Sequence, residues 1–225
     1  MEAFKTVFNN LRKDNDYTIV SHVYSDKKDY LSYKYKPDII KQDYEAELIG
    51  THSSKWNMVW EHIDKDLTTK EHIVRIAENN NTDILVVGYQ GRKGPKKDPT
   101  LLGSNADLIA RQPICPVLVF KRAELRKDKK NGGYKFLVCM DGREMGAKAL
   151  ESVIKIIDKE KDEIIVLTVK TYKTDCDKIE EESTNICKEA GIKYHRYEIL
   201  EKEDKETEGK AIADYINIDD TPYID

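Results

Sequence analysis

An internal repeat limits the fold of this chain more than any other feature of its sequence. Apolar residues at helical spacing over 4–11 return over 150–157, an offset of 146 positions. The strand-like apolar segment at 17–23 returns at 163–169 with the same offset, so no gap separates helix from strand. Later segments match with a slightly shorter offset. The sequence therefore predicts two copies of one structural unit.

Each copy alternates apolar runs with amphipathic segments. Continuous Ile, Val and Leu runs, such as 84–87, are typical of strands in a parallel sheet that is buried on both faces. We predict an α/β fold, a parallel sheet with helices on both faces, built as two tandem units. The predicted parts are a first unit at 1–122, a charged linker at 123–133 and a second unit at 134–225.

The same patterns place the individual elements. Strands are expected at 17–24, 56–63, 84–88, 117–121, 134–140 and 163–169, and helices at 4–11, 38–48, 69–79, 105–111, 150–157 and 175–190. Gly191 is expected to end the last of these helices.

Composition excludes several classes of protein. Charged residues make up 36% of the chain, but the formal net charge is only −4, so no basic excess indicates nucleic-acid binding. The apolar runs are far shorter than the ~20 residues that span a bilayer, and the N-terminus lacks a secretory pattern. The four cysteines form no CxxC pair, which argues against a zinc site. We expect a cytoplasmic protein with no membrane, nucleic-acid or metal partner.

One glycine-rich connection is a candidate binding site. Gly88 and Gly91 follow the apolar run at 84–87, and Gly103, Ser104 and Asn105 open the next helix. Glycines allow backbone N–H groups to approach a phosphate closely, and a helix N-terminus adds unpaired donors. The same residues also fit a purely structural turn with a helix cap. The spacing matches neither a Walker loop nor the GxGxxG of dinucleotide-binding folds.

The segment 83–94, together with Leu101 to Ser104 and Cys115 to Val119, resembles the C-terminal half of a universal stress protein domain. The strand at 134–140 followed by Asp141 and Gly142 is similar to the opening of such a domain. The resemblance covers nearly the whole chain as two tandem, incomplete units.

That resemblance implies a five-stranded parallel sheet of order 3-2-1-4-5 and, in many members, dimers formed through the last strand, here Val117 to Phe120. Some members bind ATP through a pattern G-x2-G-x9-G-[S/T], whereas here eleven residues separate Gly91 from Gly103. The implied nucleoside contacts are Asp141 and Val169, the latter matched by Val23 in the first copy. ATP or AMP is the implied ligand. The candidate binding residues are Gly88, Gly91, Gly103, Ser104, Asn105, Asp141 and Val169.

Neither copy contains every element of the family pattern. The first copy lacks the opening strand with its Asp-Gly, and the second lacks the glycine loop and last strand. One interpretation is a shortened chain. The other is a composite domain in which the strand at 136–140 lies beside the strand at 84–87.

Three functions fit the sequence to different degrees. The first is a non-catalytic stress-response module that binds ATP or AMP, and the second is a scaffold or dimerisation module that keeps the fold without nucleotide. The third is an enzyme of the adenine nucleotide α-hydrolase-like group. The SGGxDS and HxGH signatures of such enzymes are absent and no catalytic constellation is readable, so we expect no enzymatic activity.

Overall fold

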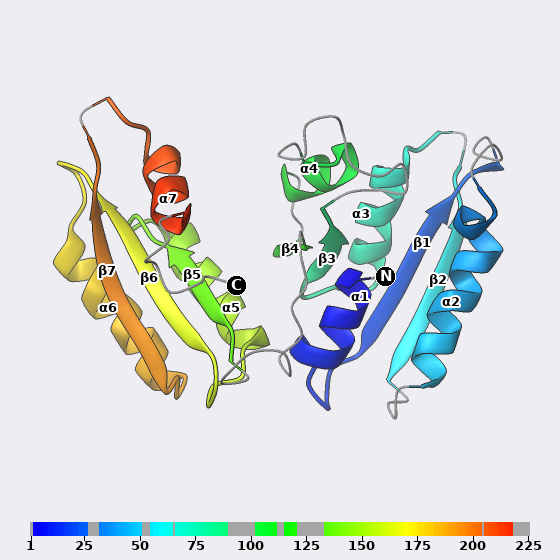
Figure 1. Ribbon diagram of the computed structural model, residues 1–225, viewed down its shortest axis with the longest axis horizontal. Helices are drawn as coiled ribbons and strands as arrows, with labels where there is room; N and C mark the ends of the chain where they lie inside the picture. The colour runs from blue at the N-terminus through cyan, green and yellow to red at the C-terminus, as the bar shows by residue number, and fades with distance from the viewer. Residues whose placement is uncertain are drawn as a thin grey trace. The chain divides into compact units, whose positions relative to one another are not determined.

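The computed structural model describes residues 2–26, 32–50, 55–64, 66–89, 102–111, 115–120, 133–203 and 205–217. The chain divides into two compact units, Met1–Ala123 and Glu124–Asp225, each described here by itself (Figure 1). The predicted linker lies outside the described residues except for Gly133. No helix in the described ranges is long and apolar enough to cross a membrane.

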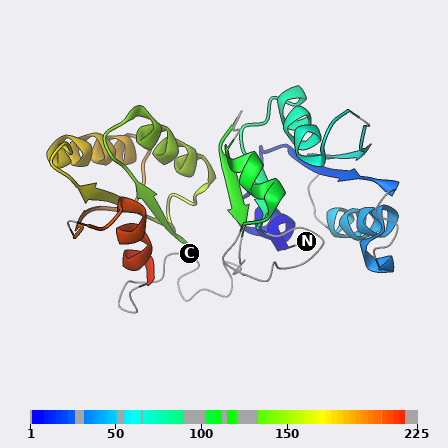
Figure 2. The same cartoon turned by 90° about the horizontal axis from the view of Figure 1, so that it is seen from above.

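The first unit contains two short parallel sheets. One pairs β1 (Thr18–Tyr24) with β2 (Trp56–His62), and the other pairs β3 (Leu85–Gly88) with β4 (Val117–Phe120). Its helical segments are α1 (Glu2–Thr6), η1 (Val7–Leu11), η3 (Tyr33–Tyr35), α2 (Pro37–Ile49), α3 (Thr69–Asn79) and α4 (Ser104–Arg111). Seen from above, α3 and α2 lie on opposite faces of the β1–β2 pair (Figure 2).

The second unit contains one three-stranded parallel sheet of order β5-β6-β7. Its strands are β5 (Lys135–Cys139), β6 (Glu163–Lys170) and β7 (Tyr194–Glu201), and its helices are α5 (Glu144–Ile156), α6 (Cys176–Glu189) and α7 (Glu208–Asn217). In Figure 2, α5 and α6 lie on one face of this sheet and α7 on the other. The predicted α/β class, with parallel strands, helices on both faces and two units, is confirmed.

The core of the second unit explains its continuous apolar strand. Ile164, Ile165, Val166 and Leu167 are at most 2% exposed, because helices cover both faces of β6. The main cluster of buried residues is Val138, Met140, Leu150, Ile157, Ile164, Val166, Ile179, Cys187 and Ile192. Gly191 ends α6 as predicted: its φ is +72°, and the following amide of Ile192 donates to the carbonyl of Cys187 at 2.9 Å.

Three details differ from the sequence-based expectations. The helix expected at 150–157 is α5, which begins six residues earlier, at Glu144, and ends at Ile156. The expected α-helix over 4–11 changes to a π-helix at Val7–Leu11, and the amide of Arg12 donates to the Val7 carbonyl five residues back. In addition, the order 3-2-1-4-5 implied by the resemblance puts the absent opening strand between β1 and β3, and these two strands belong to different sheets in the structure. Helix α1 contacts β3 instead. The composite pairing of 136–140 with 84–87 stays a prediction.

Candidate functional site

A backbone hydrogen bond joins the two ends of the glycine-rich connection between β3 and α4. Gly88 is the last residue of β3 and pairs with Phe120 of β4. The amide of Tyr89 donates to the Phe120 carbonyl at 2.7 Å, and the carbonyl of Tyr89 accepts the amide of Gly103 at 3.0 Å. The end of β3 therefore lies directly beside the residue that precedes α4. Gly91 lies outside the described residues.

Helix α4 presents its N-terminus at this point. Ser104 and Asn105 are its first two residues, and both are exposed. The carbonyl of Gly103 accepts the amide of Asp107 at 2.9 Å, which is the first hydrogen bond of the helix. The amides of the preceding first-turn residues have no acceptor within the helix, and they carry the positive end of its dipole. Gly103, Ser104 and Asn105 are thus placed where an anion is favoured.

In the second unit, Asp141 and Val169 lie at the carboxyl edge of neighbouring strands. Cys139 pairs with Leu167 in register, and the Met140 amide donates to the Leu167 carbonyl at 3.0 Å. Continuing that register places Asp141 opposite Val169. Residues at the carboxyl ends of parallel strands commonly contact ligands in open α/β sheets.

The carboxylate of Asp141 is already engaged by a residue of its own turn. Its Oδ1 accepts the Arg143 amide at 3.0 Å, and its Oδ2 forms an ion pair with the Arg143 guanidinium. These bonds hold the pKa of Asp141 below its ordinary value. Gly142, between them, has a φ of +81°, which favours glycine and lets the turn close. A nucleoside that binds Asp141 must share or replace Arg143.

The structure distributes the predicted binding residues over both units. Gly88, Gly103, Ser104 and Asn105 come together in the first unit, and Asp141 and Val169 in the second. Within the described ranges, no three His, Cys, Asp or Glu side chains form a group that could hold a metal ion.

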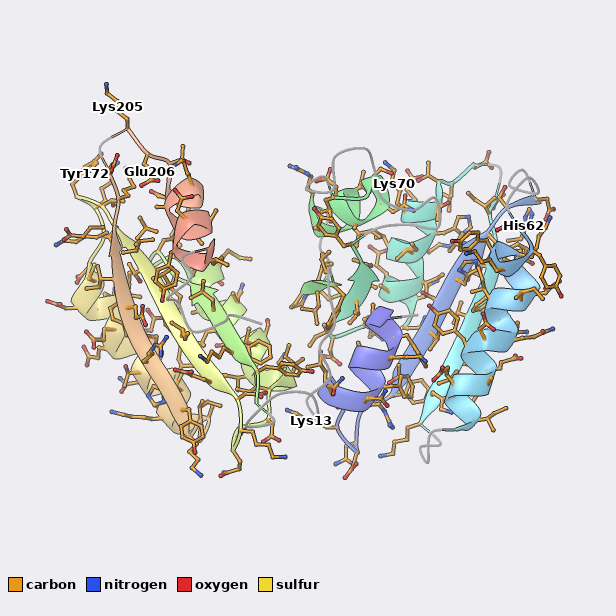
Figure 3. All side chains as sticks on the ribbon, in the orientation of Figure 1. Lys13, His62, Lys70, Tyr172, Lys205 and Glu206 are labelled. Carbon is orange, nitrogen blue, oxygen red and sulfur yellow. The ribbon has the colours of Figure 1, made fainter. Side chains whose placement is uncertain are left out.

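A polar depression at the carboxyl end of β2 was not predicted from the sequence. It measures about 530 Å³ and is lined by Glu61, His62, Ile63, Asp64, His72 and Arg75. Figure 3 labels one of the lining residues, His62, at the end of β2. The side chains that line this depression come from a strand, a connection and a helix, so they form no compact sequence motif. The alternation of β2 and the helical period of α3 were the only available signals.

Comparison with solved structures finds the fold of this chain in a crystal structure of a universal stress protein from Archaeoglobus fulgidus DSM 4304. The two chains are 19% identical, the TM-score is 0.57, and the match covers 84% of this chain and 67% of that one. The matched share is larger than the first unit alone, so the similarity of fold extends into the second. Comparison with curated proteins finds no match.

Similarity of fold at 19% identity does not assign the chain to a family, but a family model does. The model described as the universal stress protein family matches residues 1–121, which is more than half of the chain. The match includes the glycine-rich connection, α4 and β4. The chain therefore belongs to the universal stress protein family.

Proposed function

We propose that the chain is a non-catalytic stress-response module of the cytoplasm that binds ATP or AMP through the connection between β3 and α4. The observation that carries this proposal is the hydrogen bond between the Gly103 amide and the Tyr89 carbonyl. It joins Tyr89, the residue that follows Gly88 at the end of β3, to the N-terminus of α4. The Gly103 amide is used in this bond, but the amides of the first turn of α4 after it have no acceptor within the helix, and phosphate groups favour such donors at the positive end of a helix dipole.

Charge in the connection supports the same ligand. Arg92, Lys93, Lys96 and Lys97 lie between Gly91 and Gly103 in the sequence. Four cationic residues in a chain of net charge −4 favour an anionic ligand at this place. The Ser104 hydroxyl, exposed in the first turn of α4, is the side chain that would donate to a phosphate oxygen.

Calorimetry on the purified full chain tests the proposal. ATP and AMP are expected to release heat on binding, and adenosine, which lacks phosphate, to bind more weakly. Ser104→Ala should weaken ATP binding by roughly tenfold, because it removes one hydrogen bond to a charged group. Ser152→Ala is the matched control, since that hydroxyl on α5 donates to the carbonyl of Lys148. An absence of heat at millimolar ATP and AMP would exclude nucleotide binding.

The ion pair of Asp141 with Arg143 favours a second candidate function, that of a scaffold or dimerisation module that does not bind nucleotide. Its implied nucleoside contact is occupied by Arg143 in this structure. Strand β4 pairs only with β3 among the described strands, and its four residues are half-buried. This strand is the proposed contact with a second copy of the chain. Light scattering that shows a strict monomer at all concentrations would contradict the dimer.

A further inference from the structure

His72 is a buried polar side chain enclosed by hydrogen-bonding groups. It lies in the first turn of α3 and is 1% exposed. Its Nε2 accepts the backbone amide of Asp64 at 2.9 Å. Its Nδ1 lies 3.3 Å from Oε2 of Glu61 and 3.0 Å from Nη2 of Arg75, and Arg75 also donates to the same Glu61 oxygen at 3.2 Å. The ring thereby joins the end of β2, the connection after it and α3.

The hydrogen bond at Nε2 favours one tautomer of His72. A backbone amide only donates, so the Nε2 that faces Asp64 carries no proton. The ring is therefore neutral, with its proton on Nδ1, where Oε2 of Glu61 at 3.3 Å is the acceptor and Nη2 of Arg75 at 3.0 Å is a competing donor. A second proton has only Nε2 to occupy, where it would face the Asp64 N–H. Protonation and the Asp64 hydrogen bond exclude each other.

The charged groups around the His72 ring do not favour another arrangement of its protons. Glu61 attracts a charged ring, but the Arg75 guanidinium lies as close and repels it. On β1, the residue in register with Glu61 is Val23, which is apolar and buried. On α3 itself, Glu71 is bonded to Thr68, and Lys70 precedes it as a further cation.

Helix α4, which packs against α3, adds no group that changes the balance between the attraction of Glu61 and the repulsion of Arg75 for a charged His72 ring. Its acidic Asp107 and basic Arg111 form an ion pair with each other at 2.9 Å. The Asp64 side chain lines the same depression as His72. The bond to the Asp64 amide is thus the contact that a second proton on His72 would remove.

The second unit shows that the fold does not require these polar groups. Thr68 caps α3 and Thr207 caps α7, which aligns the two units here with an offset of 139. At that offset, Leu200 occupies the position of Glu61, Ala211 that of His72 and Asp214 that of Arg75. Leu200 pairs with Val169, as Glu61 pairs with Val23, so the alignment holds in three dimensions. The positions of Glu61 and His72 are thus both occupied by apolar residues in the second unit.

We propose that His72 is a pH-sensitive clamp: its protonation on acidification breaks the bond from the Asp64 amide and releases the connection between β2 and α3. The release changes the depression lined by Glu61 and Arg75 at the carboxyl edge of the first unit. The second unit, with Leu200 and Ala211 at the equivalent positions, does not respond. The proposal is independent of nucleotide binding.

Amide hydrogen exchange by NMR on the full chain tests the clamp. The protection factor of the Asp64 amide should fall as the pH is lowered from 7.5 to 5.0, because protonation of the His72 ring and the hydrogen bond from this amide exclude each other. Nitrogen shifts of the ring should show the proton on Nδ1 at pH 7.5. Both readouts come from the wild-type protein, so they do not depend on the folding of a variant.

Two variants separate the clamp from general acid effects. His72→Gln keeps a neutral acceptor near the Nε2 position, and its Asp64 protection should not change between pH 7.5 and pH 5.0. His62→Gln is the control. His62 follows Glu61 in the chain but is exposed, and its Nε2 lies 3.0 Å from Oδ2 of Asp26. That variant should keep the wild-type response. Equal loss of Asp64 protection in His72→Gln and wild type, or a proton on Nε2 at pH 7.5, would overturn the proposal.

Discussion

The carboxylate of Asp162 accepts the backbone amide of Tyr134 at 2.8 Å, 28 residues away in the chain. Its other oxygen accepts the amide of Asp158 at 2.7 Å. Asp162 has no exposed surface, and it ties the start of β5 to the turn that leads into β6. A charge buried in this way is stabilised by the fixed amides around it.

Replacing Asp162 should therefore destabilise the second unit. Asp162→Ala leaves two amides without their acceptor, and we expect the free energy of unfolding to fall by roughly 2–4 kcal/mol. Asp162→Asn keeps one acceptor and should cost about half as much. Urea unfolding monitored in the second unit measures both. Glu151→Ala, at an exposed position of α5, should remain within about 0.5 kcal/mol of wild type.

Gly133 lies so close to the backbone of Lys161 that no side chain fits. A Cβ at Gly133 would overlap the Lys161 carbonyl group. We expect Gly133→Ala to cost about 1–3 kcal/mol in thermal unfolding, since the neighbour is backbone and cannot rotate away. Gly209→Ala in α7 is the opposite case, with no atom within 4 Å of its Cβ, and should be neutral or stabilising. Equal effects of the two substitutions would contradict this account.

The N-terminus of α3 should respond to pH. Thr68 and Glu71 form a capping box in which the Glu71 carboxylate accepts from the Thr68 amide and hydroxyl, both at 2.6 Å. The hydrogen bonds from Thr68 lower the pKa of Glu71. A carboxyl whose pKa is lowered in the folded state stabilises that state at neutral pH and loses the effect as pH falls through the folded value.

We expect Thr68→Ala to cost about 1 kcal/mol at pH 7 and less at pH 3. Circular dichroism during urea unfolding at the two pH values measures the difference. Thr207→Ala provides the comparison, because the third residue of α7 is Lys210, whose amide donates to the Thr207 hydroxyl at 3.2 Å. Its cost should change less with pH. A Thr68→Ala cost that is the same at pH 3 and pH 7 would rule out a role for the Glu71 charge.

The cysteines of the second unit should differ in reactivity. Burial raises the pKa of Cys187 to about 11, and its side chain belongs to the main core cluster. At pH 8 about one thousandth of that thiol is ionised, and the thiolate is the reactive form. Cys139 is exposed at the end of β5. Mass spectrometry should find iodoacetamide on Cys139 first and on Cys187 only after unfolding. Equal labelling of the two in native protein would show that the core opens readily.

The periodic parts of the fold were predictable from the sequence. Helix α3 has the bounds that its apolar spacing predicts, and β6 differs from its predicted range by one residue. Both depend on local patterning that burial enforces. The π-helical turn at Val7–Leu11 was not predictable, because apolar spacing is similar for an α-helix and a slightly wider turn over five residues.

The candidate site was predictable only in part. Gly88, Gly103 and Ser104 could be named as candidates because glycines and helix starts leave a local signature, and the structure brings their backbones together. The ion pair of Asp141 with Arg143 depends on the backbone of Gly142, and the contact of Glu61 with His72 joins residues eleven apart on different elements. Such contacts arise from tertiary packing, which a single sequence does not display.

The bond between Tyr89 and Gly103 also bears on the length of the segment between them. Once both ends of a loop are fixed, the entropic free energy of closing it rises only with the logarithm of its number of residues. Two residues beyond the family spacing then cost about 0.15 kcal/mol in chain entropy, far less than a single hydrogen bond. Evolution can therefore vary the number of residues between these anchors almost without thermodynamic consequence, while the scaffold on either side stays unchanged.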